Sequence, residues 1–304
     1  MNKQTIGLGK YTAAYTSIGD GVPVILLHGF FGNAGTLSAL AQGLSSNYCC
    51  ISLELLGFGD SSKPDIRYLI DDHVEFLKEF LTAKKISKFY LIGYSYGAWV
   101  AAAYAIDRSD LATPTPELAS MVLVAPAGIR DDSFVGRYDL LKPLLWQTPL
   151  IDLALKTIAP FAKLMGKQKS FETVRISREA LITQPAARSF LIERLKPEAA
   201  VDTVEKSIDR IETPTLVIAG ESDGTIPLWH AQTYAEKIPQ ASLIIIPAAD
   251  HDLVQTHSQE VTRSIVNFWN ISGWLITKVV ANSNQESNGS HCAAGHLGLV
   301  LTER

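Results

Sequence analysis

Short apolar runs of strand type alternate with segments of helical period along most of the chain. The runs are nearly continuous in apolar residues, which is typical of strands buried on both faces of a parallel sheet. Between them, apolar residues recur at helical spacing, as in Ile70, Val74, Leu77 and Leu81. This alternation predicts a doubly wound α/β sheet. The strand-type runs are YTAAYTSI, VPVILLHG, YCCISLELLG, KFYLIGY, ASMVLVAPAG, TPTLVIAGE and ASLIIIPAA.

One long region breaks the alternation. Residues 129–211 have a helical pattern throughout, and strand-type runs resume only at Thr215. An all-helical insertion between two strands of one sheet is typical of a lid over a site at the carboxyl ends of the strands. We therefore predict a core of residues 1–128 and 212–270 with 129–211 inserted as a helical cap, and two independent domains are the alternative. The polar segment 271–304 is predicted to be a loosely ordered tail.

A turn signal lies between the first two runs. YTAAYTSI and VPVILLHG flank Asp20-Gly21, a dipeptide that favours a tight turn between antiparallel strands. The pattern therefore predicts a β-hairpin at this point.

The overall composition and charge are those of a globular protein with a large apolar core. The chain has 304 residues, of which 47% are hydrophobic, and a formal net charge of −4. This balance gives no reason to expect nucleic acid or an anionic membrane as a partner. The first residues lack the apolar stretch of a signal peptide, and no uncharged apolar segment is long enough to span a bilayer. We therefore expect a monomer or homodimer that acts on a small molecule, without stable membrane insertion.

The cysteines indicate a compartment. Cys49 and Cys50 are adjacent in an apolar run and Cys292 lies near the C-terminus, which makes a poor disulfide framework. We interpret them as reduced thiols, which predicts a cytoplasmic protein. The sequence contains no CxxC, HExxH or other compact metal-ligand spacing, so neither a metal nor a cofactor is expected.

The segment FYLIGYSYGAWVAAAYA carries the first candidate for chemistry. Its beginning predicts a strand and its alanine-rich end a helix, and Gly93-Tyr94-Ser95-Tyr96-Gly97 lies between them. G-x-S-x-G at such a junction indicates a nucleophile elbow, a tight turn that presents the serine and requires small neighbours. Free N–H groups at the helix N-terminus favour developing negative charge. The alternative is that the glycines only permit a tight turn.

A serine nucleophile needs a base that is oriented by an acid, and in this arrangement the chain order is serine, acid, histidine. Asp223 follows the run TPTLVIAGE, and His251 follows ASLIIIPAA. We therefore predict Asp223 as the acid and His251 as the base. Asp250 and Asp252 flank the histidine and are expected to support its loop. The alternatives are Glu221 and Asp209 for the acid and His257 for the base.

Acyl transfer also needs two donors for the oxyanion. The backbone N–H of Tyr96, directly after the serine, is predicted to be one. The loop after the run VPVILL supplies the other, from Phe30 or, as the second choice, Phe31, whereas His28 is expected to shape the turn. Aromatic side chains suggest an apolar acyl pocket, although ordinary packing is the alternative. The candidates are Phe31, Tyr94, Phe134, Tyr138 and Trp146.

Taken together, these motifs resemble the α/β-hydrolase fold superfamily. They occur in the expected order across residues 10–270, as His28-Gly29-Phe30, GFGDS at 57–61, the Ser95 elbow, GESDGTIP with Asp223 and ADH with His251. The resemblance implies an eight-stranded, mostly parallel sheet flanked by helices, with a helical cap between strands six and seven. Glu54 stands where relatives commonly have Asp, which we interpret as a change in loop anchoring.

The resemblance also narrows the reaction. Haloalkane dehalogenases and soluble epoxide hydrolases have Asp at the elbow, so Ser95 argues against both. The meta-cleavage C–C hydrolases typically have a GGPG-like loop and a Trp after the catalytic His, where this chain has Phe30-Phe31-Gly32 and Asp252. The resemblance therefore favours a carboxylesterase or lipase-like serine hydrolase acting on esters with a small to medium apolar acyl group. A C–C hydrolase, a thioesterase and a non-catalytic ligand receptor are the alternatives.

Overall fold

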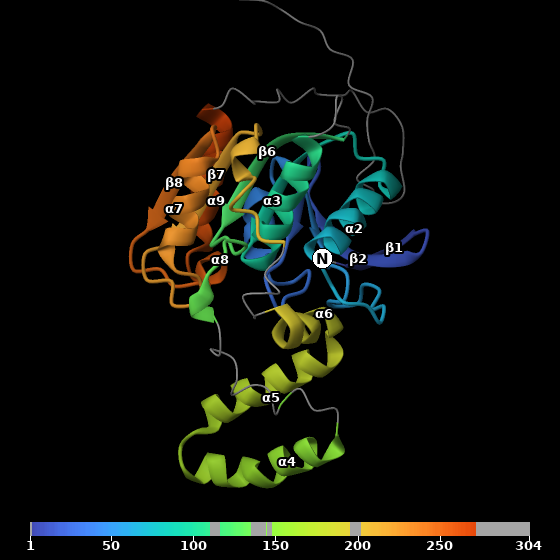
Figure 1. Cartoon of the computed structure of the whole chain (residues 1–304), viewed down its shortest axis with the longest axis vertical. Helices are drawn as coiled ribbons and strands as arrows, with labels where there is room; N and C mark the ends of the chain where they lie inside the picture. The colour runs from blue at the N-terminus through green and yellow to red at the C-terminus, as the bar shows by residue number, and fades with distance from the viewer. Residues whose placement is uncertain (1, 110–115, 135–143, 145–147, 195–201, 272–304) are drawn as a thin grey trace, which may run out of the picture.

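The computed structural model describes residues 2–109, 116–134, 144, 148–194 and 202–271. Eight strands of this part of the chain form one sheet in the order β1-β2-β4-β3-β5-β6-β7-β8 (Figure 1). The pairings of β2 with β1 and β4 are antiparallel and the others are parallel, which confirms the predicted eight-stranded, mostly parallel sheet. The strands are β1 Lys3–Leu8, β2 Tyr11–Ile18, β3 Val22–Leu27, β4 Tyr48–Leu53, β5 Lys88–Tyr94, β6 Glu117–Val124, β7 Thr215–Gly220 and β8 Ala241–Ile246.

Helices cover both faces of the sheet because the central strands are apolar on both sides. In β3, Ile25 and Leu27 belong to one buried cluster, and Val24 and Leu26 belong to the other. The first cluster is completed by α2 (Ile70–Ala83), α3 (Tyr96–Ser109) and α7 (Leu228–Lys237). The second is completed by α1 (Ser38–Leu44), α8 (Leu253–Thr256) and α9 (Ser258–Ile271).

The predicted hairpin at Asp20-Gly21 is wrong. Strand β4 lies between β2 and β3, and β2 pairs instead with β1. The residues of β1 alternate between exposed and half-buried positions, so their weak apolar pattern did not predict a strand. A dipeptide that favours a turn acts locally, whereas the parallel pairing of β3 with β4 buries a whole apolar strand.

The adjacent cysteines of β4 lie in different environments. Cys49 belongs to one core cluster and Cys50 to the other, because neighbouring strand residues point to opposite faces. Cys50 is a free thiol whose pKa is raised to about 12 by burial. Cys292 lies outside the described residues.

Between β6 and β7 the described elements are helical, and we refer to α4, α5, α6 and η3 as the cap. Helices α4 and α5 extend away from the sheet, whereas α6 lies beside it (Figure 1). No helix of the described chain combines the length and the apolarity needed to cross a bilayer. The elements of this region are η1 Asp132–Phe134, α4 Pro149–Leu164, α5 Gln168–Thr183, α6 Pro185–Ser189, η3 Phe190–Arg194 and η5 Ile208–Arg210.

Candidate active site

Ser95 lies in a one-residue turn between β5 and α3. Its φ of 54° falls in the left-handed region, which costs a non-glycine residue free energy. The surrounding backbone holds this conformation, since the Ser95 N–H donates to the Val124 carbonyl at 2.9 Å. The Ser95 carbonyl accepts from the N–H groups of Ala98 and Ala127. The serine is therefore held in the conformation of a nucleophile elbow.

The two glycines of the motif are required by close backbone approaches. A β-carbon at Gly93 would meet the carbonyl oxygen of Gly97, and one at Gly97 would meet the carbonyl oxygen of Leu27. Backbone cannot move aside as a flexible side chain can, so only hydrogen fits at either position. This confirms that the elbow requires small residues on both sides of the serine.

His251 reaches the serine from the loop after β8. Its Nε2 lies 3.0 Å from Ser95 Oγ, and its Nδ1 lies 2.8 Å from Oδ2 of Asp223, in the loop after β7. The Ser95 residue and the Asp223 side chain are almost fully buried, whereas the His251 side chain is 18% exposed. An Asp carboxylate on Nδ1 favours the tautomer with the proton on Nδ1, which leaves Nε2 free to accept from the serine hydroxyl.

Backbone hydrogen bonds fix the acid and the base. The second oxygen of Asp223 accepts from the N–H groups of Thr225 and Ile226, both at 2.8 Å. Asp250 accepts from the N–H groups of Gly224 and His251, at 2.9 and 2.7 Å, so it ties the acid loop to the base loop. These bonds lower the pKa of the Asp250 carboxyl. Asp250 therefore supports the loop, as expected.

The rival candidates lie elsewhere. Glu221 accepts from the Ala248 N–H, and His257 contacts the Thr256 hydroxyl through Nδ1. Asp209 lies in η5 and is exposed. None of the hydrogen bonds between described residues joins these three side chains to Ser95 or His251.

The loop after β3 passes directly beside the nucleophile. A β-carbon at Gly29 would lie 3.1 Å from the Ser95 β-carbon, so the next residue, Phe30, presents its backbone near the serine hydroxyl. No hydrogen bond between described residues uses the Phe30 N–H, which leaves it available to a ligand. The Tyr96 N–H lies at the N-terminus of α3. Both predicted oxyanion donors therefore belong to segments that meet at Ser95.

His28 shapes this loop and is buried. Nδ1 lies 2.8 Å from the Gly29 carbonyl, and the Leu55 N–H donates to Nε2 at 3.1 Å. An imidazole that accepts at Nε2 and donates at Nδ1 is neutral. Burial lowers the pKa of His28 to about 4, which keeps it neutral near pH 7 and agrees with the structural role expected for it.

Glu54 anchors the neighbouring loops. Its carboxylate is fully buried and accepts from the N–H groups of Ala34 and Asp60, and Lys3 Nζ lies 3.0 Å from Oε1. A β-carbon at Gly59 would overlap this carboxylate. The longer side chain at this position therefore has its loop-anchoring partners in place.

Aromatic rings from the core and the cap meet above the elbow. The Phe190 ring of the cap element η3 lies 5.2 Å from that of Phe30 and 5.7 Å from that of Tyr96. Phe31 packs on Phe30 at 4.4 Å, and Trp99 lies 6.1 Å from Phe190. Phe190 and Trp99 were not among the residues predicted from the sequence. Trp99 follows the elbow by one helical turn, a spacing that could have indicated it.

The remaining pocket candidates differ in position. Tyr94 belongs to the core cluster on the opposite face of the sheet from Tyr96, and its hydroxyl donates to the His251 carbonyl at 3.0 Å. Phe134 ends η1. Tyr138 and Trp146 lie outside the described residues. The described residues contain no group of three or more His, Cys, Asp or Glu side chains arranged to hold a metal ion.

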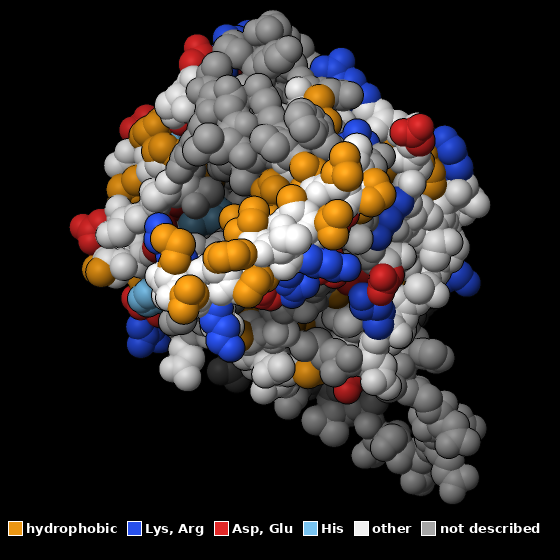
Figure 2. All heavy atoms as spheres, turned by 90° about the horizontal axis from the view of Figure 1, so that it is seen from below, with side chains coloured by type: hydrophobic (Ala, Val, Ile, Leu, Met, Phe, Trp, Pro, Cys, Tyr) orange, Lys and Arg blue, Asp and Glu red, His pale blue; other side chains and the backbone are white. Residues whose placement is uncertain are grey.

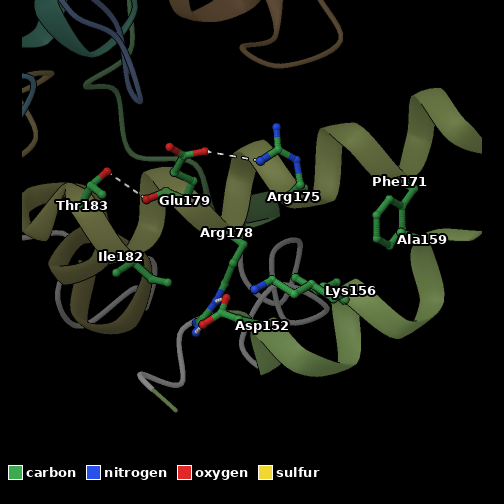
Figure 3. A pocket seen from close by; sticks show the side chains of 10 residues that line it. Asp152, Lys156, Ala159, Phe171, Arg175, Arg178, Glu179, Ile182 and Thr183 are labelled. Carbon is green, nitrogen blue, oxygen red and sulfur yellow. Dashed lines mark hydrogen bonds and ion pairs between the residues drawn. The ribbon is translucent and has the colours of Figure 1, made fainter. Parts of the chain in front are cut away.

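A cavity of about 390 Å³ lies in the cap between α4 and α5 (Figure 3). None of its lining residues is a predicted site residue. It is separate from the loops that carry Ser95, Asp223 and His251.

Comparison with known proteins identifies the family. A family model described as the α/β hydrolase fold matches residues 22–258, so the chain belongs to the α/β-hydrolase fold family. It is 24% identical over 274 residues to 2-hydroxy-6-oxo-6-(2'-aminophenyl)hexa-2,4-dienoic acid hydrolase of Metapseudomonas resinovorans, covering 86% of this chain and 89% of that protein. It is 28% identical over 258 residues to Lipase 3 of a Moraxella species, covering 76% of this chain and 72% of that protein.

Solved structures share the fold. The meta-cleavage product hydrolase CumD of Pseudomonas fluorescens IP01 superposes with a TM-score of 0.67 at 23% identity, covering 88% of this chain and 98% of that one. A thermophilic esterase of Thermogutta terrifontis superposes with a TM-score of 0.66 at 20% identity, covering 89% of this chain and 99% of that one. At such identities the superpositions show the fold, and the reaction has to be argued from the site.

Proposed function

We propose that this protein hydrolyses carboxylic esters through an acyl-enzyme on Ser95. The observation that carries the proposal is the continuous hydrogen-bonded chain from Ser95 Oγ through His251 to Asp223, with distances of 3.0 and 2.8 Å. This is the arrangement that makes a serine hydroxyl nucleophilic, because the base takes its proton as the bond to carbon forms. Lipases among the relatives give the proposal independent support.

In the first step, Ser95 Oγ attacks the ester carbonyl carbon and His251 Nε2 takes the hydroxyl proton. Asp223 holds the imidazole and stabilises the cation that forms. The backbone N–H groups of Phe30 and Tyr96 stabilise the oxyanion of the tetrahedral intermediate. The carbon–oxygen bond to the leaving group then breaks, and His251 gives its proton to the departing alkoxide.

In the second step, water attacks the acyl carbon while His251 takes a proton from the water. The new tetrahedral intermediate collapses, the bond to Ser95 Oγ breaks, and His251 returns the proton to the serine. The rings of Phe30, Tyr96 and Phe190 offer an apolar surface beside the reacting carbon, which favours a small to medium apolar acyl group.

Hydrolysis of a C–C bond on the same three residues is the second candidate. It is favoured by the relatives and solved structures that are meta-cleavage product hydrolases. Against it stand the sequence Phe30-Phe31-Gly32 in the oxyanion loop and Asp252 after the histidine. Asp252 precedes α8, where its carbonyl accepts from the Gln255 N–H at 2.8 Å, and it offers no aromatic face to a substrate.

Replacement of the nucleophile tests the proposal. Ser95→Ala should lower kcat for p-nitrophenyl esters by about 10⁴- to 10⁶-fold, whereas the matched change Ser46→Ala at an exposed position should leave it within about twofold. Retention of most activity in Ser95→Ala would remove Ser95 from the mechanism.

Covalent labelling and a substrate panel separate the alternatives. A fluorophosphonate should label the Ser95 peptide in folded protein, as read by mass spectrometry. Absence of the adduct would favour a non-catalytic ligand receptor. A higher kcat/KM for a vinylogous C–C substrate than for esters or thioesters of graded chain length would favour the second candidate.

A further inference from the structure

The outer helix of the cap, α4, exposes its hydrophobic side chains. None of its residues is buried. Isolated exposed apolar residues are common, but a contiguous set on one element marks an interaction surface. The most exposed large hydrophobic side chains of α4 and the residue after it are Leu150 at 71%, Leu153 at 59%, Ile158 at 51%, Phe161 at 65%, Leu164 at 86% and Met165 at 68%.

These side chains form one continuous band. Leu150, Leu153, Phe161 and Leu164 recur at spacings that return to the same side of an α-helix. Figure 2 shows this end of the molecule, where hydrophobic side chains form a band with Lys and Arg side chains along one side. We call this band, from Leu150 to Met165, the apolar face of α4.

A row of lysines borders the apolar face. Lys156 and Lys163 lie two turns apart on one edge of α4, and Lys167 follows the end of the helix, and all three are exposed. The acidic residue of α4, Asp152, accepts from the Arg178 guanidinium at 3.2 and 3.3 Å, so a cation already balances its charge. The exposed edge is therefore locally positive although the whole chain carries a net charge of −4.

The contacts of α4 with α5 hold the apolar face outward. The Arg178 side chain of α5 is only 3% exposed and also donates to the carbonyls of Leu144 and Thr148, before α4 begins. Figure 3 shows Arg178 meeting Asp152 beside the cavity between the two helices. In Figure 1, α4 is the element of the cap farthest from the sheet. The described core therefore does not cover this face.

We propose that the apolar face of α4 docks on a lipid surface that carries anionic headgroups. An amphipathic helix with large apolar side chains on one face and lysines beside it lies in the plane of a membrane interface, where the side chains enter the acyl boundary and the lysines meet the headgroups. A second copy of this chain would bring the same positive edge, so the lysine row favours an anionic partner over self-association. The net charge of the whole chain does not reveal this row.

Vesicle binding by the intact protein tests the proposal. Cosedimentation should show binding to vesicles of phosphatidylcholine mixed with phosphatidylglycerol, weaker binding to phosphatidylcholine alone, and a loss of binding as salt is raised. The double variant Leu153→Asp, Phe161→Asp should bind at least about 100-fold more weakly, because each change removes roughly a tenfold contribution or more. The triple variant Lys156→Gln, Lys163→Gln, Lys167→Gln should lose about fivefold per lysine at low salt.

A matched control separates local charge from net charge. Lys63→Gln, Lys85→Gln and Lys206→Gln together make the same change in net charge at exposed positions outside α4 and α5 and should bind as the unchanged protein does. Equal binding by the two triple variants, or no binding of the unchanged protein to anionic vesicles, would overturn the proposal.

The oligomeric state is measured on the same protein preparations. A dimer of the unchanged protein that the double Asp variant converts to monomer, without vesicle binding, would assign the apolar face to a second copy and overturn the proposal. The inference goes beyond ester hydrolysis, and binding is measured for Ser95→Ala as well. Failure of the proposed reaction and failure of docking are therefore distinguishable.

Discussion

The loops that carry Ser95, Asp223 and His251 are held differently from the outer helix of the cap. Each of the three segments follows a parallel strand of the sheet, and hydrogen bonds hold the backbone of Ser95 and His251 and the side chain of Asp223. The Asp223 carboxylate accepts from two backbone N–H groups, those of Thr225 and Ile226. No hydrogen bond in this network of described residues involves α4.

Helix α4, in contrast, buries none of its residues and contacts the rest of the described chain through α5. The buried Arg178 guanidinium of α5 pairs with Asp152 of α4, and no residue of α4 belongs to the core clusters of the described chain. Side chains on such an element can change with little cost in free energy of unfolding. The difference is that the sheet and its loops hold Ser95, Asp223 and His251 in place, whereas substitutions on the outer side of α4 can be made without disturbing that arrangement.

The largest expected effect comes from a substitution at Asp223, in one of the loops that the sheet holds in place. Asp223→Asn should lower kcat by about 10³- to 10⁴-fold with little change in the free energy of unfolding. Asparagine can donate to His251 Nδ1, which favours the tautomer with a proton on Nε2, and that nitrogen then cannot accept from Ser95. Initial rates on a water-soluble ester measure the loss.

The same substitution at Asp209, the exposed alternative in η5, is the control and should leave kcat within about twofold. A large loss in Asp209→Asn with little loss in Asp223→Asn would reassign the acid.

Most of the sheet and the elbow at Ser95 could be predicted from the sequence. Central strands such as β3 are apolar throughout, and the elbow glycines leave a pattern because backbone crowding admits no other residue. Strand β1 was missed because its half-exposed residues carry little pattern. The hairpin at Asp20-Gly21 was wrong because a local turn signal does not show which strands pair.

The features that could not be predicted depend on contacts between segments that are distant in the sequence. Phe190 meets Phe30 and Tyr96 only because η3 packs against the loop after β3 and the start of α3, and no spacing within one segment indicates such a contact. Likewise, the ring of Tyr94 could be predicted to lie near the serine, but its hydrogen bond to the His251 carbonyl depends on how the loop after β8 returns. Sequence gives the chemistry of single loops better than their mutual packing.

Lowering the pH should decrease the free energy of unfolding through protonation of His28. Burial lowers its pKa to about 4 in the folded protein, whereas the unfolded chain has the ordinary value near 6.5. Between these values the unfolded state binds a proton that the folded state does not, so the free energy of unfolding falls as pH falls. The loss should reach about 3 kcal/mol by pH 4. Urea unfolding at several pH values from 7 to 4 measures it.

A non-titrating variant isolates this contribution. His28→Gln should be less stable at pH 7, because the hydrogen bonds to Gly29 and Leu55 change, but its stability should depend less on pH between 6.5 and 4. If both proteins lose the same free energy over this range, other groups account for the acid sensitivity.

The smallest effect tests how the elbow supports the base. The Tyr94 hydroxyl donates to the His251 carbonyl at 3.0 Å, so Tyr94→Phe removes one hydrogen bond that holds the loop of the base, worth about 1 kcal/mol. We expect kcat to fall about fivefold with KM unchanged, because the bond orients the imidazole without touching the substrate. Tyr90 is the matched control, since it lies in the same strand and its buried hydroxyl has no hydrogen-bond partner among the described residues. A loss in Tyr94→Phe no greater than in Tyr90→Phe, or one that appears in KM, would mean that the elbow presents the serine but does not position the base.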